Sequence, residues 1–240
     1  MNKKVQLRII ELAVPILEYQ KWVQIEYIKD ISENDLISLL TKEFNNLNKF
    51  AKENNITQIK ISVPWEWRKL KEVGFLQASG YLECYQLKLS TKSPSATVKE
   101  ITDPDLIKDL IRKNAQYHHL KIPYYFRKDV EKGFEEFMTI VKNNLKENRA
   151  LILGIEDKGQ IIAVAESEYI DNYIEVNDLY IDEKYRGMGY GHALLNAVWD
   201  KIKERKLEKM ALFTGYNLEA LHFYERLGFQ KKYLSWVKNI

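Results

Sequence analysis

The chain has 240 residues, of which 45% are apolar, so it can bury a sizeable core in one large or two small domains. Its net charge of +3 is small and Lys and Arg form no continuous basic run, which argues against nucleic acid as a partner. No apolar run reaches membrane-spanning length and no signal-peptide core follows Met1, so we expect a soluble, cytoplasmic protein without a membrane partner.

The first 90 residues are predicted to alternate strands and helices, and they contain no glycine before Gly74. Apolar residues spaced three and four apart predict an amphipathic helix, and the alternating Ile and Val residues after it predict a strand. The single cysteine, Cys84, excludes an intrachain disulfide and is expected to be buried rather than catalytic. The predicted elements are a strand at 22–28, a helix at 34–54, a strand at 56–63, a short helix at 65–73 and a strand at 81–89.

A polar, proline-containing stretch, Ser90–Ala96, is the predicted linker to the rest of the chain. After it, Asp103 is expected to cap a helix with Pro104 at its first position. Two adjacent histidines, His118 and His119, cannot easily face one site, so no metal centre is expected. The remaining predicted elements are a strand at 97–101, helices at 104–117 and 129–147, strands at 150–156, 160–169 and 173–181, a helix at 191–204, and strands at 210–214 and 231–238.

A glycine-rich stretch joins the predicted strand at 173–181 to the predicted helix at 191–204, with the sequence Tyr185-Arg186-Gly187-Met188-Gly189-Tyr190-Gly191-His192. Glycine lets the backbone approach a ligand closely, and the free N–H groups and dipole of a helix start favour an anion. A P-loop would need Lys-Ser or Lys-Thr after the last glycine, and a Rossmann fingerprint would place its third glycine one residue later. The stretch is therefore a cradle for a different phosphate ligand, or a surface turn without one.

A second motif lies about one helix and one strand downstream and reads Asn217-Leu218-Glu219-Ala220-Leu221-His222-Phe223-Tyr224-Glu225-Arg226-Leu227-Gly228-Phe229. Together with the spacing Arg186-x-x-Gly189-x-Gly191, this motif resembles the two signatures of the GNAT superfamily of N-acetyltransferases. The resemblance covers about residues 97–240. It implies an α/β fold with a mixed, mostly antiparallel sheet and helices on both faces, and acetyl-CoA as the cosubstrate without a metal.

The first 90 residues repeat the order of the C-terminal half, and Leu70–Phe75 echoes Tyr224–Phe229. We interpret 1–90 as a degenerate GNAT-like half-domain and 97–240 as the acetyltransferase domain; the other interpretation is a coincidental helix that ends in Gly-Phe. Leu70 stands where Tyr224 would be, and residues 29–34 replace the arginine–glycine loop. The first half is therefore not expected to bind coenzyme A.

The resemblance implies which residues hold the cofactor. Backbone N–H groups of the glycine-rich loop would bind the pyrophosphate, and an N–H freed by a bulge before the loop would polarise the thioester carbonyl. Asn217 would bond near the pantetheine arm, or cap the following helix, or do both. The predicted cofactor-binding residues are Leu179, Tyr180, Ile181, Arg186, Gly187, Met188, Gly189, Tyr190, Gly191, His192, Asn217 and Tyr224.

Acetyl transfer also needs a base, because a lysine-type amine has a pKa near 10.4 and is mostly a cation at neutral pH. Glu175 and Asp178 are the candidates, and strand alternation places them on opposite faces unless a bulge intervenes. The resemblance implies that the Tyr224 hydroxyl lies beside the coenzyme A sulfur and protonates the leaving thiolate. The other interpretations are exposed strand carboxylates and a packed tyrosine.

The acceptor is left open by the sequence. Glu166 and Glu168 alternate on one strand face and favour a cationic primary amine, either a small molecule or a protein. The aromatic stretch Tyr117–Phe126 is expected to line the acceptor pocket or to pack between helices. The alternative function is a non-catalytic acyl-CoA-binding module that presents a partner surface. A homodimer is left open.

Overall fold

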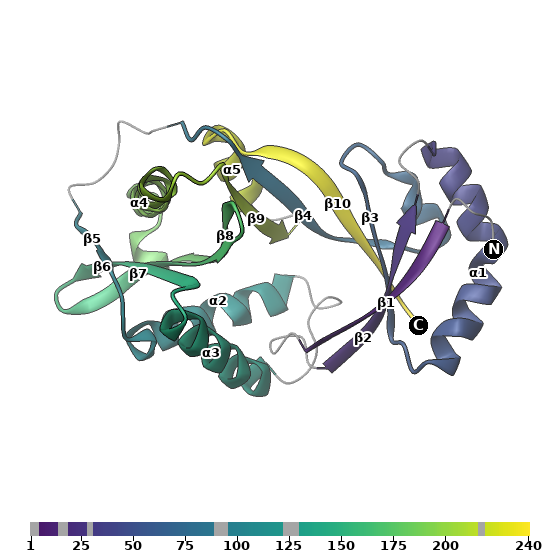
Figure 1. The fold of residues 1–240 in the computed structure, drawn as a ribbon, viewed down its shortest axis with the longest axis horizontal. Helices are drawn as coiled ribbons and strands as arrows, with labels where there is room; N and C mark the ends of the chain where they lie inside the picture. The colour runs from purple at the N-terminus through teal and green to yellow at the C-terminus, as the bar shows by residue number, and fades with distance from the viewer. Residues whose placement is uncertain (1–4, 14–18, 28–30, 89–95, 122–129, 216–218) are drawn as a thin grey trace.

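The computed structural model describes residues 5–13, 19–27, 31–88, 96–121, 130–215 and 219–240. Ten strands of these residues form one sheet in the order β1-β2-β3-β10-β4-β9-β8-β7-β6-β5, which runs the length of an elongated molecule (Figure 1). The strands are β1 (Val5–Ala13), β2 (Tyr19–Tyr27), β3 (Gln58–Pro64), β4 (Leu76–Cys84), β5 (Val98–Glu100), β6 (Ala150–Asp157), β7 (Gln160–Ile170), β8 (Tyr173–Ile181), β9 (Lys209–Gly215) and β10 (Gln230–Asn239).

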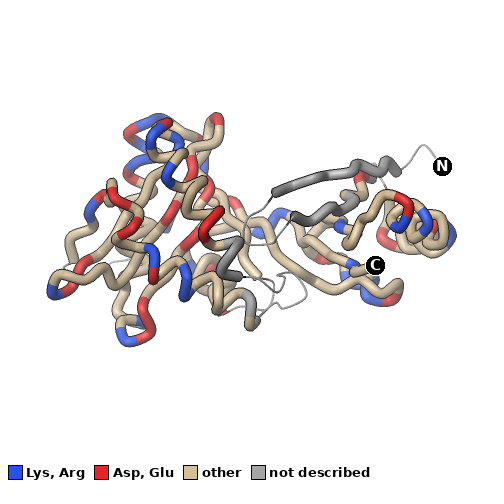
Figure 2. The backbone as a smooth tube through the Cα atoms, turned by 90° about the horizontal axis from the view of Figure 1, so that it is seen from below, with Lys and Arg blue, Asp and Glu red and all other residues tan. Residues whose placement is uncertain are grey.

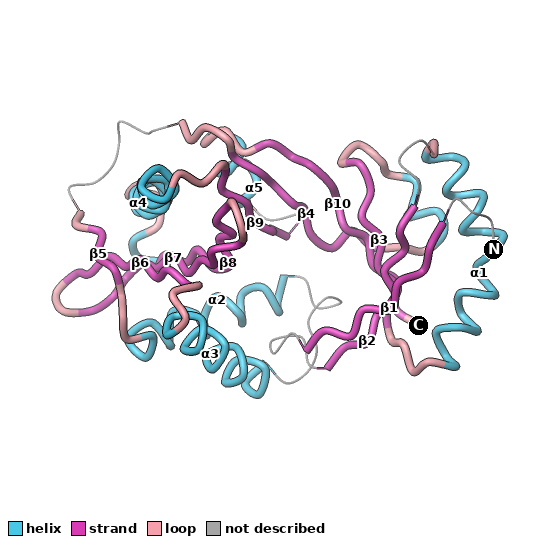
Figure 3. The backbone as a smooth tube through the Cα atoms, viewed as in Figure 1, coloured by secondary structure: helices cyan, strands magenta, loops and turns pink. Residues whose placement is uncertain are grey.

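Five α-helices and three short 3-10 helices flank this sheet within the described ranges (Figure 3). They are α1 (Glu33–Glu53), α2 (Lys108–Lys121), α3 (Val130–Lys146), α4 (Tyr190–Arg205) and α5 (Ala220–Arg226), with η2 (Lys69–Val73), η3 (Pro104–Ile107) and η4 (Glu183–Tyr185). Strand pairs β2–β3 and β8–β9 are parallel and the other pairs are antiparallel. The predicted mixed α/β fold is confirmed.

Helices cover both faces of the sheet around β6 to β9. Apolar side chains of α4 and α5 pack with Ile174, Val176 and Leu212 in one cluster, whereas α2 and α3 pack with Val164 and Tyr180 in another. Figure 1 shows α4 and the pair α2–α3 on opposite sides of β7 and β8. A third cluster joins α1 to β3 and to the C-terminal part of β10. The apolar spacing that predicted the helix at 34–54 therefore corresponds to a helix face that packs on the sheet.

The sheet is continuous across the predicted boundary between the two halves of the chain. β4 comes from the first half but lies between β9 and β10, while β10 comes from the second half and lies between β3 and β4. The order is symmetric about the β10–β4 pair, with β1-β2-β3 on one side and β7-β8-β9 on the other. This exchange supports an internal duplication, and the division into residues 1–90 and 97–240 stays a prediction.

Two strands differ from the sequence prediction. β1 was not predicted, and the strand expected at 81–89 lies at Leu76–Cys84 instead. The prediction began this strand after Gly80, because glycine is typical of a strand boundary. In the structure Gly80 lies inside β4 instead. A Cβ at Gly80 would lie 2.1 Å from the ring of Trp65, so glycine is needed there because an indole packs directly on the strand.

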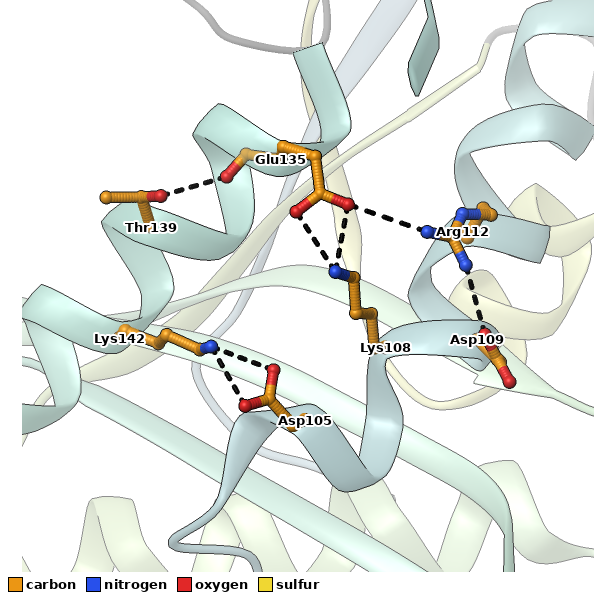
Figure 4. Close-up of polar contacts among 7 residues, drawn as sticks. All are labelled: Asp105, Lys108, Asp109, Arg112, Glu135, Thr139 and Lys142. Carbon is orange, nitrogen blue, oxygen red and sulfur yellow. Dashed lines mark hydrogen bonds and ion pairs between the residues drawn. The ribbon is translucent and has the colours of Figure 1, made fainter. Parts of the chain in front are cut away.

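Helix α2 is held against α3 by a set of ion pairs shown in Figure 4. Glu135 of α3 accepts from Lys108 at 2.9 Å and lies 3.6 Å from Arg112, and Lys142 pairs with Asp105 at 2.8 Å. These groups are partly exposed, so each pair contributes at most about 1 kcal/mol. Buried Phe134, under the Arg112 guanidinium at 4.6 Å, supplies the apolar contact that fixes α2 in place.

Local predictions at turns and caps are also confirmed. The Asp103 carboxylate accepts from the Asp105 N–H at 3.0 Å, with Pro104 at the first position of η3, and Gly74 ends η2 in the left-handed conformation at φ +82°. Lys and Arg alternate with Asp and Glu along both halves of the backbone (Figure 2). Over the described residues, no helix is both long enough and apolar enough to cross a membrane.

Candidate active site

Strands β8 and β9 part in the middle of the sheet. β8 pairs with β7 along its whole length, but it pairs with β9 only from Tyr173 to Val176. β9 itself continues to Gly215, so within the described residues the last part of β8 has no strand partner on that side. The register between β7 and β8 shifts at Asn177, which is the extra residue of a bulge. The bulge and the parting that the resemblance implies are thus both present.

The bulge changes which side chains share a face. Glu166 and Glu168 lie two residues apart on β7 and therefore point to the same face. Their partners on β8 are Asp178 and Glu175, so these two carboxylates lie on that face as well. Simple alternation would have separated Glu175 from Asp178; the inserted Asn177 brings them together. Four acidic residues thus share one face of β7 and β8 beside the point where β8 leaves β9.

The glycine-rich loop lies directly beyond β8. Its two positive-φ glycines, Gly187 at +78° and Gly189 at +89°, turn the backbone into the start of α4. In the described part of the chain, the N–H groups of residues 187–192 donate to no other backbone carbonyl, and the first bond is Ala193 N–H to Gly189 at 3.1 Å. No side chain caps this helix and no acidic residue lies in its first turn. The helix start is therefore open to an anion.

The two sequence motifs meet at this helix start. A Cβ on Gly191 would lie 3.1 Å from the Phe223 ring and 3.5 Å from Ile181, so glycine permits the close packing of α4, α5 and β8. The His192 ring also contacts Phe223 edge-on, with centroids 5.1 Å apart. Phe223 thus joins the glycine-rich loop to the helix that carries Tyr224, which explains why both motifs occur together.

Arg186 ties the loop to the end of the strand. Its Nε donates to the Ile181 carbonyl at 3.1 Å, and its guanidinium lies 5.5 Å from the Tyr180 ring centroid and 5.8 Å from that of Tyr117. The side chain is exposed and 3.7 Å from Glu183. Arg186 could add positive charge at the loop or hold the loop in place. Its hydrogen bond to Ile181 fits the second role.

Tyr224 lies at the base of the opening. It is buried, with its ring 5.3 Å from Phe223 and 5.4 Å from Phe229. Burial raises the pKa of Tyr224 well above the ordinary phenol value, and the nearby Asp178 carboxylate adds to this rise. The phenol is therefore neutral at physiological pH and able to donate a hydrogen bond.

The carboxylates differ in their partners. Asn114 of α2 donates to Asp178; burial raises the pKa of Asp178 to about 6, and this hydrogen bond opposes the rise. Burial, with the Asp178 charge, raises the pKa of Glu166 to about 8, so Glu166 is mostly protonated near neutral pH. Glu168 pairs with Arg149 at 3.1 Å.

Glu175 stands apart from the other three acids. Among the described residues, its carboxylate makes no hydrogen bond and no ion pair. Burial and then the neighbouring Glu168 charge raise the pKa of Glu175 above the ordinary carboxyl value. A half-buried carboxylate without a partner is the group in this cluster that is free to receive a cation.

Sequence reasoning missed Asn114, although a signal was present. Asn114 lies on the buried face of α2 with Leu110, Ile111 and Ala115. A polar amide among apolar residues on such a face is expected to have a hydrogen-bond partner. The other predicted residues occupy the loop, the end of β8 and α5 as described. Asn217 and residues 122–126 of the aromatic stretch lie outside the described residues, whereas Tyr117 contacts His118 edge-on at 5.8 Å.

Comparisons with known proteins agree with this geometry. Residues 114–229 match the Acetyltransferase (GNAT) family. An uncharacterised N-acetyltransferase of Methanocaldococcus jannaschii is 25% identical over 152 residues, which cover 60% of this chain and 66% of that protein's length. A GCN5-related N-acetyltransferase from Sphaerobacter thermophilus superposes with a TM-score of 0.62 at 12% identity, covering 98% of this chain and 76% of its own.

A second solved structure is the PaiA N-acetyltransferase from Thermoplasma acidophilum, determined in complex with coenzyme A. It has a TM-score of 0.50 at 19% identity and covers 61% of this chain and 100% of its own. At these identities the two solved structures establish the fold, and they leave the acceptor open.

Proposed function

We propose, from the match of residues 114–229 to the GNAT acetyltransferase family, that the protein transfers an acetyl group from acetyl-CoA to a primary amine. The observation that carries the proposal is the parting of β8 from β9 beside an open helix start, with the neutral Tyr224 at its base. A family relative with bound coenzyme A supports the choice of cofactor.

The loop would hold the cofactor by its backbone. N–H groups from Gly187 to His192 face no carbonyl of the described chain, and the dipole of α4 adds positive potential at the same place. The pyrophosphate of acetyl-CoA matches this site in charge. Arg186 would keep the loop on β8 rather than contact the phosphates, because its Nε is already bound to Ile181.

The acetyl group would lie where β8 leaves β9. There an extended pantetheine arm can pair with β8 as a missing strand, and a backbone N–H of Leu179, Tyr180 or Ile181 can donate to the thioester carbonyl. An N–H aimed at the developing oxyanion stabilises the tetrahedral intermediate more than the ground state. Asn217 would add a bond near the pantetheine arm.

Protons balance if Glu175 is the base and Tyr224 the acid. Glu175 takes a proton from the ammonium, the freed amine attacks the carbonyl carbon, and the C–S bond breaks. The thiolate takes the Tyr224 proton, which solvent replaces. Asp178 is the less suitable base because Asn114 already holds it, and its charge instead keeps Tyr224 protonated.

The test is thiol release from acetyl-CoA across a panel of primary amines, together with calorimetry of coenzyme A binding to the full chain. We expect saturable binding of coenzyme A and amine-dependent release of thiol. Binding without release by any amine would favour the non-catalytic acyl-CoA-binding module. The absence of binding heat in folded protein would remove the proposal altogether.

A further inference from the structure

Three aromatic side chains form a row across neighbouring strands beside the opening. Tyr81 of β4 is the cross-strand partner of Phe213 on β9 and of Tyr233 on β10. The Tyr81 ring lies 4.8 Å from Phe213 and is stacked on Tyr233 at 4.7 Å, with 14° between the planes. Phe213 is 45% exposed although it occupies the middle of the sheet. The exposed Phe213 ring, continued by Tyr81 and Tyr233, makes this face of the sheet a candidate binding surface.

The row shares its sheet face with Glu175. The register pairs Glu175 with Ala211 and Ala211 with Glu83, and the three rings lie two residues along from this line. The charge of Glu175 is felt by these rings: burial, followed by Glu175, raises the pKa of Tyr233 to about 12. The unpartnered carboxylate and the exposed ring are thus neighbours on one surface.

Positive charge lies on the other side of this line from the rings, because Lys209 precedes Ala211 on β9 by two residues and Phe213 follows it by two. Glu83 accepts from Lys209 and lies 3.4 Å from Lys232, so two ammonium groups meet one carboxylate. Both ammonium groups also lie near the Tyr85 ring, at 5.7 and 5.1 Å from its centroid. Along the strands, Glu175 therefore lies between the aromatic row on one side and the Lys209 ammonium group on the other.

We propose that Tyr81, Phe213 and Tyr233 bind the body of the acceptor, which is a primary monoamine joined by a short linker to a flat apolar ring. Its ammonium pairs with Glu175, and its ring stacks on Phe213. A polyamine fits poorly in either direction, because its second ammonium would meet the three rings, which offer no carboxylate, on one side and the ammonium groups of Lys209 and Lys232 on the other. This inference rests on the proposed function and names its substrate class.

The inference also gives the first half of the chain a role in the reaction. Tyr81 and Glu83 belong to β4, which lies between β9 and β10 only because the two halves exchange strands. The first half then supplies one wall of the acceptor site without binding coenzyme A itself.

The experiment measures binding of phenethylamine, ethylamine and spermidine to the coenzyme A-loaded full chain by calorimetry. Phenethylamine should bind at least tenfold more tightly than ethylamine, which lacks the ring, and spermidine should bind no more tightly than ethylamine. Equal affinities of the first two amines, or tighter binding of spermidine, would overturn the proposal.

Variants locate the effect. Phe213→Ala should weaken phenethylamine at least fivefold and leave the affinities for coenzyme A and ethylamine unchanged, while Phe213→Tyr should retain tight binding. Leu106→Ala, which removes an exposed apolar side chain on η3, is the matched control. If Phe213→Ala altered only the oligomeric state, the row would be an interface between copies and the proposal would fall. Coenzyme A binding is measured separately. A failure of the proposed function can therefore be distinguished from a failure of the proposed acceptor site.

Discussion

Each half of the sheet contains a strand, a following helix and a second strand parallel to the first, yet the two helices begin in opposite ways. In the first half these elements are β2, α1 and β3, and in the second half β8, α4 and β9. At α1 the Ser32 hydroxyl accepts from the Asp35 N–H at 3.2 Å, and two acids lie in the first turn. At α4 there is a glycine and no side-chain cap.

The first acid of α1 also binds a neighbouring element. Glu33 accepts from the backbone N–H groups of Arg68 and Lys69, which begin η2. The negative potential of these acids stabilises the helix and repels an anion. The start of α4 differs from that of α1 in lacking a side-chain cap and acidic residues, and these absences are what the proposed phosphate site in the second half depends on.

The second contrast is between Tyr224 and Leu70, which occupy matching places in the repeated order. Both side chains are buried, but only Tyr224 has a hydroxyl group that can donate a proton. Tyr224→Phe should lower kcat by about 10²- to 10⁴-fold, since it removes the proposed acid, and leave coenzyme A affinity within about twofold. The check is thiol release alongside calorimetry. Tyr185→Phe is the control: its hydroxyl bonds to Asp157 at 2.8 Å and it should keep near-normal turnover. Equal losses in both variants would contradict the assignment.

A third contrast concerns buried charge, because α1 and β3 bury no carboxylate whereas β7 buries Glu166. The folded pKa of Glu166, about 8, lies above its ordinary value of 4.5, so between these values only the folded chain keeps the proton. The free energy of unfolding should therefore fall as pH rises through this window. Glu166→Gln should reduce the fall, which Asp178 and Glu175 also contribute to, and should exceed the parent in stability at pH 9 with little difference at pH 4.

Urea unfolding across this pH range measures the effect. Glu136→Gln, at an exposed position on α3, is the control and should leave the pH dependence of the parent unchanged. A parallel pH profile for the parent and Glu166→Gln would show that Glu166 is not the titrating group.

The part of the site that is local in sequence could be predicted, and the part set by strand pairing could not. The glycine-rich loop and Tyr224 follow from spacing within single turns and helices. The shared face of Glu175 and Asp178 depends on one bulge residue, Asn177, whose position is fixed by register with β7. The aromatic row forms only because β4 lies between two strands that are more than a hundred residues away in sequence. A local sequence pattern cannot predict such a pairing. Gly80 also led the prediction to place the start of β4 too late in the sequence.

The open helix start can be closed by substitution. Gly189→Glu places a carboxylate where the pyrophosphate would bind and adds a side chain at φ +89°, so the Kd for coenzyme A should rise at least tenfold. Gly159→Glu is the matched control, since Gly159 has φ +80° and open space around it in the turn between β6 and β7. It should cost stability without changing the Kd. Calorimetry of both variants separates loss of the site from backbone strain, and an unchanged Kd in Gly189→Glu would contradict the cradle.

The reverse change at α1 should have the smallest effect. Ser32→Ala removes the hydroxyl that satisfies the Asp35 N–H, which destabilises a helix by about 1 kcal/mol. It should not create a phosphate site, because the charges of Glu33 and Asp35 remain in the first turn. Urea unfolding should show the lower stability, and coenzyme A should bind with the parent stoichiometry of one. A second equivalent of bound coenzyme A would mean that the hydroxyl cap, rather than the acidic first turn and missing glycines, keeps the first half from binding the cofactor.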